Sequence, residues 1–389
     1  MRLHRAAAVA ACSAALLGGL LTPSATAQDG AAKPPAPTNS RVDKHVSTQS
    51  VKEIKAYWTP ERTREALANP EPMLKAGPKR EKADRLPATP SGANLAAVTA
   101  VADAARPATS PQISPVAATS STTSTAETSS TASAAATEVA VAQDVPYSTS
   151  IPNVVVGKLF FTKPDGTNGT CTASVIVSNN KNTLWTAGHC VHLGTGGGGT
   201  NWFTNIEFVP GYKGDGTAEG QRPWGTWYYD HLYAPNDWTA YRDYQEGDMA
   251  AVVLKPDSLY GNIQDAIGAL GYQFGNVTDY DDVFSVGYPG EGYHRTDMDA
   301  ERMMYCRGNT EDADPWWPTD DRLKIDCDMG KGASGGPMFI GLLAYNPQII
   351  GSNSHVHEDA TTGERVTDDL FSATHDANAV GVINTVNGA

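Results

Sequence analysis

Ser334 lies in a glycine-rich stretch, residues 329–337 of this 389-residue chain, that is suited to acyl-transfer chemistry. A serine enclosed by glycines can occupy a tight turn with its hydroxyl exposed. Gly332 has no Cβ, so its backbone N–H can turn toward the same point as the N–H of Ser334. Two such donors would hold the negative oxygen that forms when a carbonyl is attacked. The stretch alone is better explained as an ordinary glycine loop.

Two further residues extend this chemistry. His189 follows an apolar run that is expected to be a strand, and it precedes Cys190, which can form a disulfide. Both neighbours would hold the imidazole firmly, as a general base requires. Asp248 opens the apolar run 250–254, where a carboxylate is costly to bury unless a partner such as the Nδ1–H of His189 meets it. Taken singly, an incidental histidine and a strand-capping aspartate are the ordinary alternatives. The order histidine, aspartate, serine is a joint signal for a nucleophile, its base and an orienting acid.

The elements that must position these residues read as β-strands. Short, β-branched apolar runs are broken by Gly, Pro, Asn and Asp, and long helical periodicity is absent from this part, apart from a short element near the C-terminus. Such spacing predicts an all-β barrel or sandwich. The predicted strands cover residues 154–156, 159–161, 173–177, 206–209, 250–254, 283–286, 338–340 and 349–350.

From about residue 150 onward, the chain resembles the chymotrypsin-like serine proteases, whose hallmark motifs match residues 186–190 (TAGHC) and 332–337 (GASGGP). It is most similar to the bacterial glutamyl-endopeptidase, or V8-like, branch. The motifs that carry this narrower resemblance are residues 209–211, 223–225, 247–250 and 287–290. The resemblance implies two six-stranded antiparallel β-barrels, about 150–265 and 270–389, with the active site in the cleft between them.

The resemblance also assigns roles. His189 would be general base and then acid, Asp248 would fix its tautomer, and Ser334 would be the acylated nucleophile. The N–H groups of Gly332 and Ser334 would form the oxyanion hole. The implied function is a serine endopeptidase that acts on proteins or peptides without metal or cofactor. The alternative is a non-catalytic, protease-like binding or adhesion protein with residues 88–142 as a stalk. An esterase of the α/β-hydrolase type has a different residue order.

Substrate specificity stays open. Asp328 occupies the family position that confers preference for Lys or Arg. Asn353 stands where glutamyl-specific relatives have a histidine, and on strict alternation His355 shares its face, with Ser354 between them. These four residues are candidates for the specificity pocket, and acidic and basic P1 preferences are both retained. Ala333 replaces the aspartate that captures a new N-terminus in trypsin-type enzymes, so that activation ion pair is not expected.

The N-terminus predicts export. Basic residues precede the apolar run 6–21, and an A-x-A sequence ends at Ala27, the pattern of a secretory signal peptide cleaved near that residue. A membrane anchor is the alternative, but the run is shorter than a span requires. The expected protein is secreted and has no membrane span.

Four cysteines remain after such a cleavage, and an even number in an exported chain indicates disulfides. Of the three pairings we favour the sequence-local one, Cys171–Cys190 and Cys306–Cys327, each worth roughly 3 kcal/mol. Zinc ligation is disfavoured because no C-x-x-C pair occurs. Cys171–Cys190 would also match the family bridge beside the catalytic histidine.

Composition divides the rest of the chain. Residues 28–87 form a charged, Pro-rich, propeptide-like region with one helix predicted at 61–68 after Thr59 and Pro60. Residues 88–144 form an Ala/Ser/Thr-rich linker expected to be disordered, and 145–389 the protease domain. A propeptide is favoured over a permanent linker, which makes the chain a zymogen. The net charge of −14 disfavours nucleic acid and anionic membranes as partners, and we expect a monomer.

Overall fold

The computed structural model describes residues 41–75, 138–195, 201–217, 220–275, 277–313, 321–359 and 361–388, together with the backbone of 98–100. The predicted signal peptide and linker residues 101–137 lie outside the described residues. No helix in the described part of the chain is long and apolar enough to cross a membrane.

The described elements are mostly short strands. The strands are β1 (Val42–Val46), β2 (Leu74–Lys75), β3 (Val98–Ala100), β4 (Val139–Asp144), β5 (Val156–Thr162), β6 (Asn168–Ile176), β7 (Thr183–Thr186), β8 (Thr204–Pro210), β9 (Trp227–Pro235), β10 (Ala250–Leu254), β11 (Gly271–Phe274), β12 (Val283–Gly287), β13 (Met304–Gly308), β14 (Glu311–Asp312), β15 (Leu323–Asp326), β16 (Pro337–Ile340), β17 (Gln348–Val356) and β18 (Asp369–Ser372). The helices are α1 (Val51–Tyr57), α2 (Pro60–Ala68), the 3₁₀ turn η1 (Gly188–Cys190), α3 (Asn236–Tyr241), α4 (Ile263–Ile267) and α5 (Ala377–Asn387).

The first sheet closes into a six-stranded barrel. Its order is β5-β6-β7-β10-β9-β8, and β8 pairs again with β5. β5 and β6 are buried along their whole length, which agrees with the apolar, β-branched runs of the sequence. They form an antiparallel hairpin in which Leu159 faces Cys171, and Gly166 supplies the positive φ that the connecting turn needs. This barrel carries β7, which is followed by η1 with His189, and β10, which begins shortly after Asp248.

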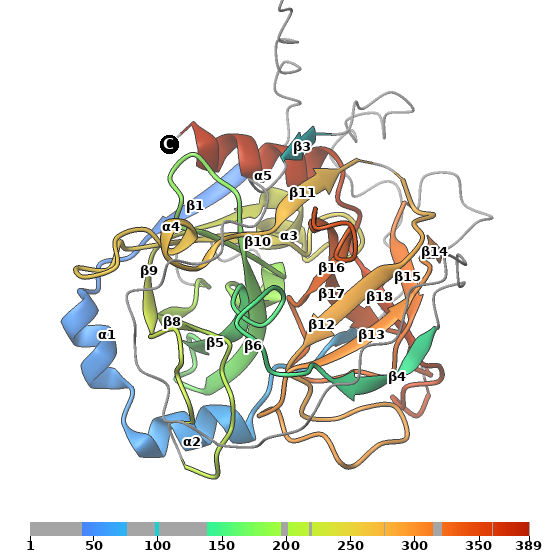
Figure 1. Cartoon of the computed structure of the whole chain (residues 1–389), viewed down its shortest axis with the longest axis horizontal. Helices are drawn as coiled ribbons and strands as arrows, with labels where there is room; N and C mark the ends of the chain where they lie inside the picture. Colours follow the sequence, from blue (N-terminus) through green and yellow to red (C-terminus); the bar gives the residue numbers. More distant parts are fainter. Residues whose placement is uncertain are drawn as a thin grey trace, which may run out of the picture. The chain divides into compact units, whose positions relative to one another are not determined.

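The second sheet is curled rather than closed. Its main path is β14-β15-β18-β17-β16-β12-β13-β4 (Figure 1). In addition, β11 and β2 pair with β17. A closed barrel beside a curled sheet is the arrangement expected for a chymotrypsin-like double barrel, so the predicted all-β fold class is confirmed. The short C-terminal element is α5, whose apolar face packs against β9 and β10.

Residues 41–75 pack on the first barrel and on the second sheet, although their composition does not read as that of a packed domain. β1 pairs antiparallel with β9, and α2 begins at Pro60 with the Thr59 side chain as its cap, as the sequence indicates. Ile54 and Ala66 are fully buried and belong to the apolar cluster that contains the buried side chains of the first barrel. Polar side chains find partners far along the chain: Gln49 exchanges hydrogen bonds with Asn205. The segment is therefore ordered by its docking surface, not by a core of its own.

Residues 139–144, which composition assigns to the linker, form β4 on the edge of the second sheet. β4 pairs antiparallel with β13, with a register shift between Tyr305 and Arg307. Of its side chains only Ala142 is buried, so backbone hydrogen bonds account for most of its order. This explains why hydrophobic patterning does not reveal the strand.

Both predicted disulfides are present. Cys171 of β6 is joined to Cys190 of η1, and Cys306 of β13 to Cys327. Because the metal-like grouping of His189 with Cys171 and Cys190 consists of one imidazole and two sulfurs already bonded to each other, it offers no thiolate ligand. The bonded cysteines are 19 and 21 positions apart in the sequence. The first bridge belongs to the first barrel and the second bridge to the second sheet.

The side chain of Lys158 in β5 is fully buried. Its Nζ donates to the carbonyl oxygen of Ala300 and lies 5.5 Å and 5.1 Å from the ring centroids of Tyr212 and Tyr288. Burial lowers the pKa of this amine from 10.5 to about 7, because the charged form loses its hydration.

This shift predicts a pH-dependent stability. Between pH 7 and pH 10.5 the unfolded chain binds a proton on Lys158 that the native chain does not, so the free energy of unfolding should rise with pH by up to about 1.4 kcal/mol per unit. Lys158→Met should remove that slope. Urea unfolding of wild type and Lys158→Met at pH 7 and pH 9 tests this. An equal change in the free energy of unfolding between the two pH values in both proteins would contradict it.

Candidate active site

His189 is held at the end of the first barrel by the turn that follows β7. Cys190 next to it is bonded to Cys171 of β6, and Gly188 before it packs against Trp238, since a Cβ there would lie 2.8 Å from the indole. The His189 side chain is 4% exposed. The ring therefore has a fixed position, as its sequence setting indicates.

Asp248 lies just before β10 and is completely buried. Its Oδ1 accepts from the backbone N–H of His189 at 2.8 Å, and its Oδ2 lies 2.9 Å from His189 Nδ1. Oδ2 also accepts from the hydroxyl of Ser354 at 2.6 Å. Since a carboxylate only accepts, the Nδ1–H of His189 donates to it, and in that tautomer Nε2 is the acceptor of the ring. Within the described residues, Nε2 is buried and has no hydrogen-bond partner.

Ser334 lies on a turn that is fastened to both sheets. Gly332 and Gly335 have φ of +85° and +77°, which only glycine adopts without strain. The backbone N–H of Thr172 donates to the Ser334 carbonyl and its hydroxyl to the Gly332 carbonyl, both at 2.8 Å. A Cβ on Gly335 would lie 2.0 Å from Thr186 Oγ1 and 2.9 Å from the N of Ala187. The turn thus packs directly against the residues that precede His189.

The hydroxyl of Ser334 faces residues 41–75, the described part of the propeptide-like region, which we call the leader. Its Oγ lies 3.5 Å from the carbonyl oxygen of Glu71 and 3.4 Å from the sulfur of Met73, and the side chain is fully buried. The N–H of Gly332 donates to the same Glu71 oxygen at 2.9 Å. A backbone carbonyl of the leader therefore occupies the position that the N–H of Gly332 addresses.

A chain of hydrogen bonds leads from Arg322 through His355 and Ser354 to the carboxylate of Asp248. Arg322 Nη1 lies 2.8 Å from His355 Nε2, and His355 Nδ1 lies 2.9 Å from Ser354 Oγ, which in turn donates to Asp248. Burial first, and then the Arg322 guanidinium, hold the pKa of His355 well below its ordinary value, so the ring is neutral and accepts at Nε2. Ser354 and His355, predicted as pocket candidates, thus lie in the network around Asp248.

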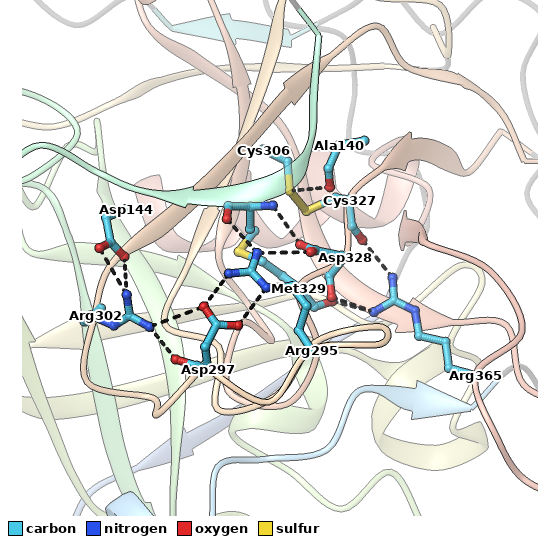
Figure 2. A network of polar contacts seen from close by, with 11 residues as sticks. Ala140, Asp144, Arg295, Asp297, Arg302, Cys306, Cys327, Asp328, Met329 and Arg365 are labelled. Carbon is cyan, nitrogen blue, oxygen red and sulfur yellow. Dashed lines mark hydrogen bonds and ion pairs between the residues drawn. A yellow bond between two sulfur atoms is a disulfide. The ribbon is translucent and has the colours of Figure 1, made fainter.

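Asp328 is buried and already engaged. Figure 2 shows Arg295 between Asp297 and Asp328, with Nη1 at 3.1 Å from Asp328 Oδ2. Asp328 Oδ1 accepts from the backbone N–H of Ala142 of β4 at 2.8 Å. In the same view Arg365 donates to the carbonyl oxygens of Cys327 and Met329 beside it. The negative charge of Asp328 is thus offset by a cation of the protein itself.

Asn353 is also saturated by internal partners. Its Oδ1 accepts from Ser285 Oγ at 2.8 Å, and its Nδ2 donates to the carbonyl oxygens of Val286 and Ala333. A register shift of β17 against β18 separates Asn353 from His355, so the two do not share the surroundings that strict alternation predicts.

Sequence reasoning missed several residues that build this site. Thr172, Trp238 and Arg322 lie in ordinary strand or loop sequences, and their contacts depend on segments far away in the chain. Met73 and Glu71 of the leader were not associated with the site. Their only local signal is the sequence Pro70-Glu71-Pro72, which favours an extended backbone.

Comparisons with known proteins find relatives by structure. The protease Anisep from Arthrobacter nicotinovorans is 28% identical with a TM-score of 0.52, and the match covers 64% of this chain and 100% of that protein. The thermostable serine protease AL20 from an extremophilic microorganism is 25% identical with a TM-score of 0.51, covering 61% and 98%. No protein-family model and no curated protein matches the chain. These likenesses identify a chymotrypsin-like protease fold and support a protease hydrolase.

The tight fit of Gly335 gives a test of the site's architecture. Gly335→Ala should lower the free energy of unfolding by more than about 3 kcal/mol, because strain at positive φ adds to a backbone collision with Thr172 O. Gly166→Ala is the matched control: its φ is +88°, but nothing lies within 4 Å, so only about 1 kcal/mol should be lost. Equal losses in denaturant unfolding would contradict the packing described for Gly335.

Proposed function

We propose that the protein is a secreted serine endopeptidase in which Ser334 is the nucleophile, His189 the base and Asp248 the orienting acid. The observation that carries this proposal is the buried Asp248–His189 pair, in which Nδ1 faces the carboxylate and Nε2 has no hydrogen-bond partner among the described residues. The Ser334 turn, packed against the residues before His189, supplies the hydroxyl. The two disulfides are compatible with an extracellular protein.

The reaction follows from these groups. Ser334 Oγ attacks the carbonyl carbon of the substrate while its proton passes to His189 Nε2, and Asp248 stabilises the imidazolium. The carbonyl oxygen becomes negative and is held by the N–H groups of Gly332 and Ser334. The imidazolium then gives its proton to the amine as the C–N bond breaks, which leaves an ester on Ser334. Water hydrolyses the ester by the same proton path, so no metal or cofactor is needed.

The V8-like assignment and the substrate preference belong to the same proposal. The assignment is supported by the four sequence motifs alone. The pairing of Asp328 with Arg295 weighs against a basic P1 preference, since the carboxylate already has a cation. The side-chain amide of Asn353 is fully bonded inside the protein, which weighs against its binding an acidic side chain of the substrate. Ser354 and His355 are assigned to the support of Asp248 rather than to substrate contact.

Replacing Ser334 tests the nucleophile. In the protein after removal of its propeptide, Ser334→Ala should lower kcat on casein by about 10⁴-fold or more and abolish labelling by a fluorophosphonate. Mass spectrometry of the labelled wild type should place the label on Ser334. Unchanged proteolysis in the variant would end the proposal, and a folded protein without labelling under any condition would favour the non-catalytic binding protein.

Replacing Ser354 tests the support of Asp248. Ser354→Ala removes a hydrogen bond to a buried carboxylate and should lower kcat about tenfold, which corresponds to about 1.4 kcal/mol, with KM unchanged. Ser352→Ala is the matched control on the same strand, because its buried hydroxyl has no partner in the described structure. A change in KM with kcat unchanged would contradict the assignment. Equal kcat values for Ser354→Ala and Ser352→Ala would contradict it as well.

A further inference from the structure

Leader residues 70–75 lie across the Ser334 site and bind both of its walls. On one side Pro70 bridges Thr170, and the N–H of Glu71 donates to the Thr170 carbonyl at 2.8 Å. On the other side β2 pairs parallel with β17, with Leu74 opposite His355 and Lys75 opposite Val356. Between these contacts the Glu71 carbonyl accepts from Gly332. Backbone pairing on both sides is the way an extended peptide binds a sheet edge.

Side chains complete this binding. A Cβ on Gly290 or Gly332 would lie 2.7 Å or 3.0 Å from the Pro70 ring, so both glycines make room for it. Glu71 forms an ion pair with Lys163 at 2.6 Å, and Lys75 forms one with Glu358 at 2.6 Å. Glu71 is only 13% exposed, so its pair is poorly screened by solvent.

Met73 is the anchor nearest to the reactive hydroxyl. It is 6% exposed and belongs to the buried apolar cluster that includes Met329, Ala333 and Val356. Its sulfur contacts Ser334 Oγ. An unbranched, polarisable side chain fills such an irregular apolar space well.

The segment is bound in an unreactive arrangement. In an attacked substrate, the carbonyl at the oxyanion donors and the side chain beside the nucleophile belong to one residue. Here the carbonyl is that of Glu71, whose side chain turns to Lys163, while the side chain beside Ser334 is that of Met73. The bond after Glu71 is an imide to Pro72. Ser334 is directed to leader atoms, and His189 Nε2 lacks a partner in the described chain, so nucleophile and base are not joined.

We propose that residues 70–75 are a built-in ligand of the site that keeps the full-length chain inactive by direct occupancy and is not itself cleaved. This inference rests on the proposed function. The rest of the leader secures the segment: β1 on β9 and the buried Ile54 and Ala66 tether it to the barrel. Such tethering gives the segment an effective concentration far above that of a free peptide. Substrate therefore gains access only after the segment leaves.

The test uses the full chain with Met73→Asp. A carboxylate in the apolar space beside Ser334 is expelled unless it is paired, so the segment should leave the site while β1, α1 and α2 stay docked. The rate of fluorophosphonate labelling at Ser334 should rise at least tenfold over wild type. Val51→Asp is the matched control: Val51 is 39% exposed at the first position of α1, where an acidic residue is tolerated, and its labelling rate should equal that of wild type.

A second measurement reports occupancy without catalysis. Hydrogen exchange is compared between Ser334→Ala and Ser334→Ala/Met73→Asp, both as full chains. The double variant should lose protection at the amides of Glu71 and Gly332, and β1 should keep its protection in both. Labelling of wild type and Met73→Asp at the same measurable rate, or equal protection in the exchange pair, overturns the inference. If exchange shows release but no protein is labelled, the occupancy stands and the serine-protease proposal fails.

Discussion

The buried carboxylate of Asp248 is the constraint on which the site depends. A charge in a core is costly unless donors surround it, and here the backbone N–H and Nδ1 of His189 and the hydroxyl of Ser354 meet it. These donors come from η1 of the first barrel and from β17 of the second sheet. The carboxylate therefore orients the imidazole and also fastens the two sheets to each other.

Much of this could be predicted from the sequence, because the signals are local. A carboxylate before an apolar strand requires a partner, a serine among glycines requires a turn, and four cysteines at close spacing favour the local bridges. Each of these rests on a few neighbouring residues and on general physical costs. The all-β fold follows in the same way from β-branched runs with turn residues between them.

The rest depends on contacts that no local pattern carries. The support of Asp248 by His355 requires the register shift in β17, and a shift of one residue changes every neighbour of a strand. The order of residues 41–75 arises from partners such as Asn205, more than a hundred residues away, and few of the leader's own side chains are apolar enough to signal burial. The charge of Asp328 could be read from the sequence, but its pairing with Arg295 could not.

The pairing of β1 with β9 has a consequence for any form of the protein that has lost its leader. β1 covers one edge of β9 from His231 to Pro235, while β10 covers the other. Without residues 42–46, that edge would present a row of bare amide and carbonyl groups to water. Exposed strand edges pair with other strands. The form without its leader would therefore have a new pairing edge on β9, on the side opposite β10. Self-association or capture of an extended peptide there would be a property of the trimmed form alone.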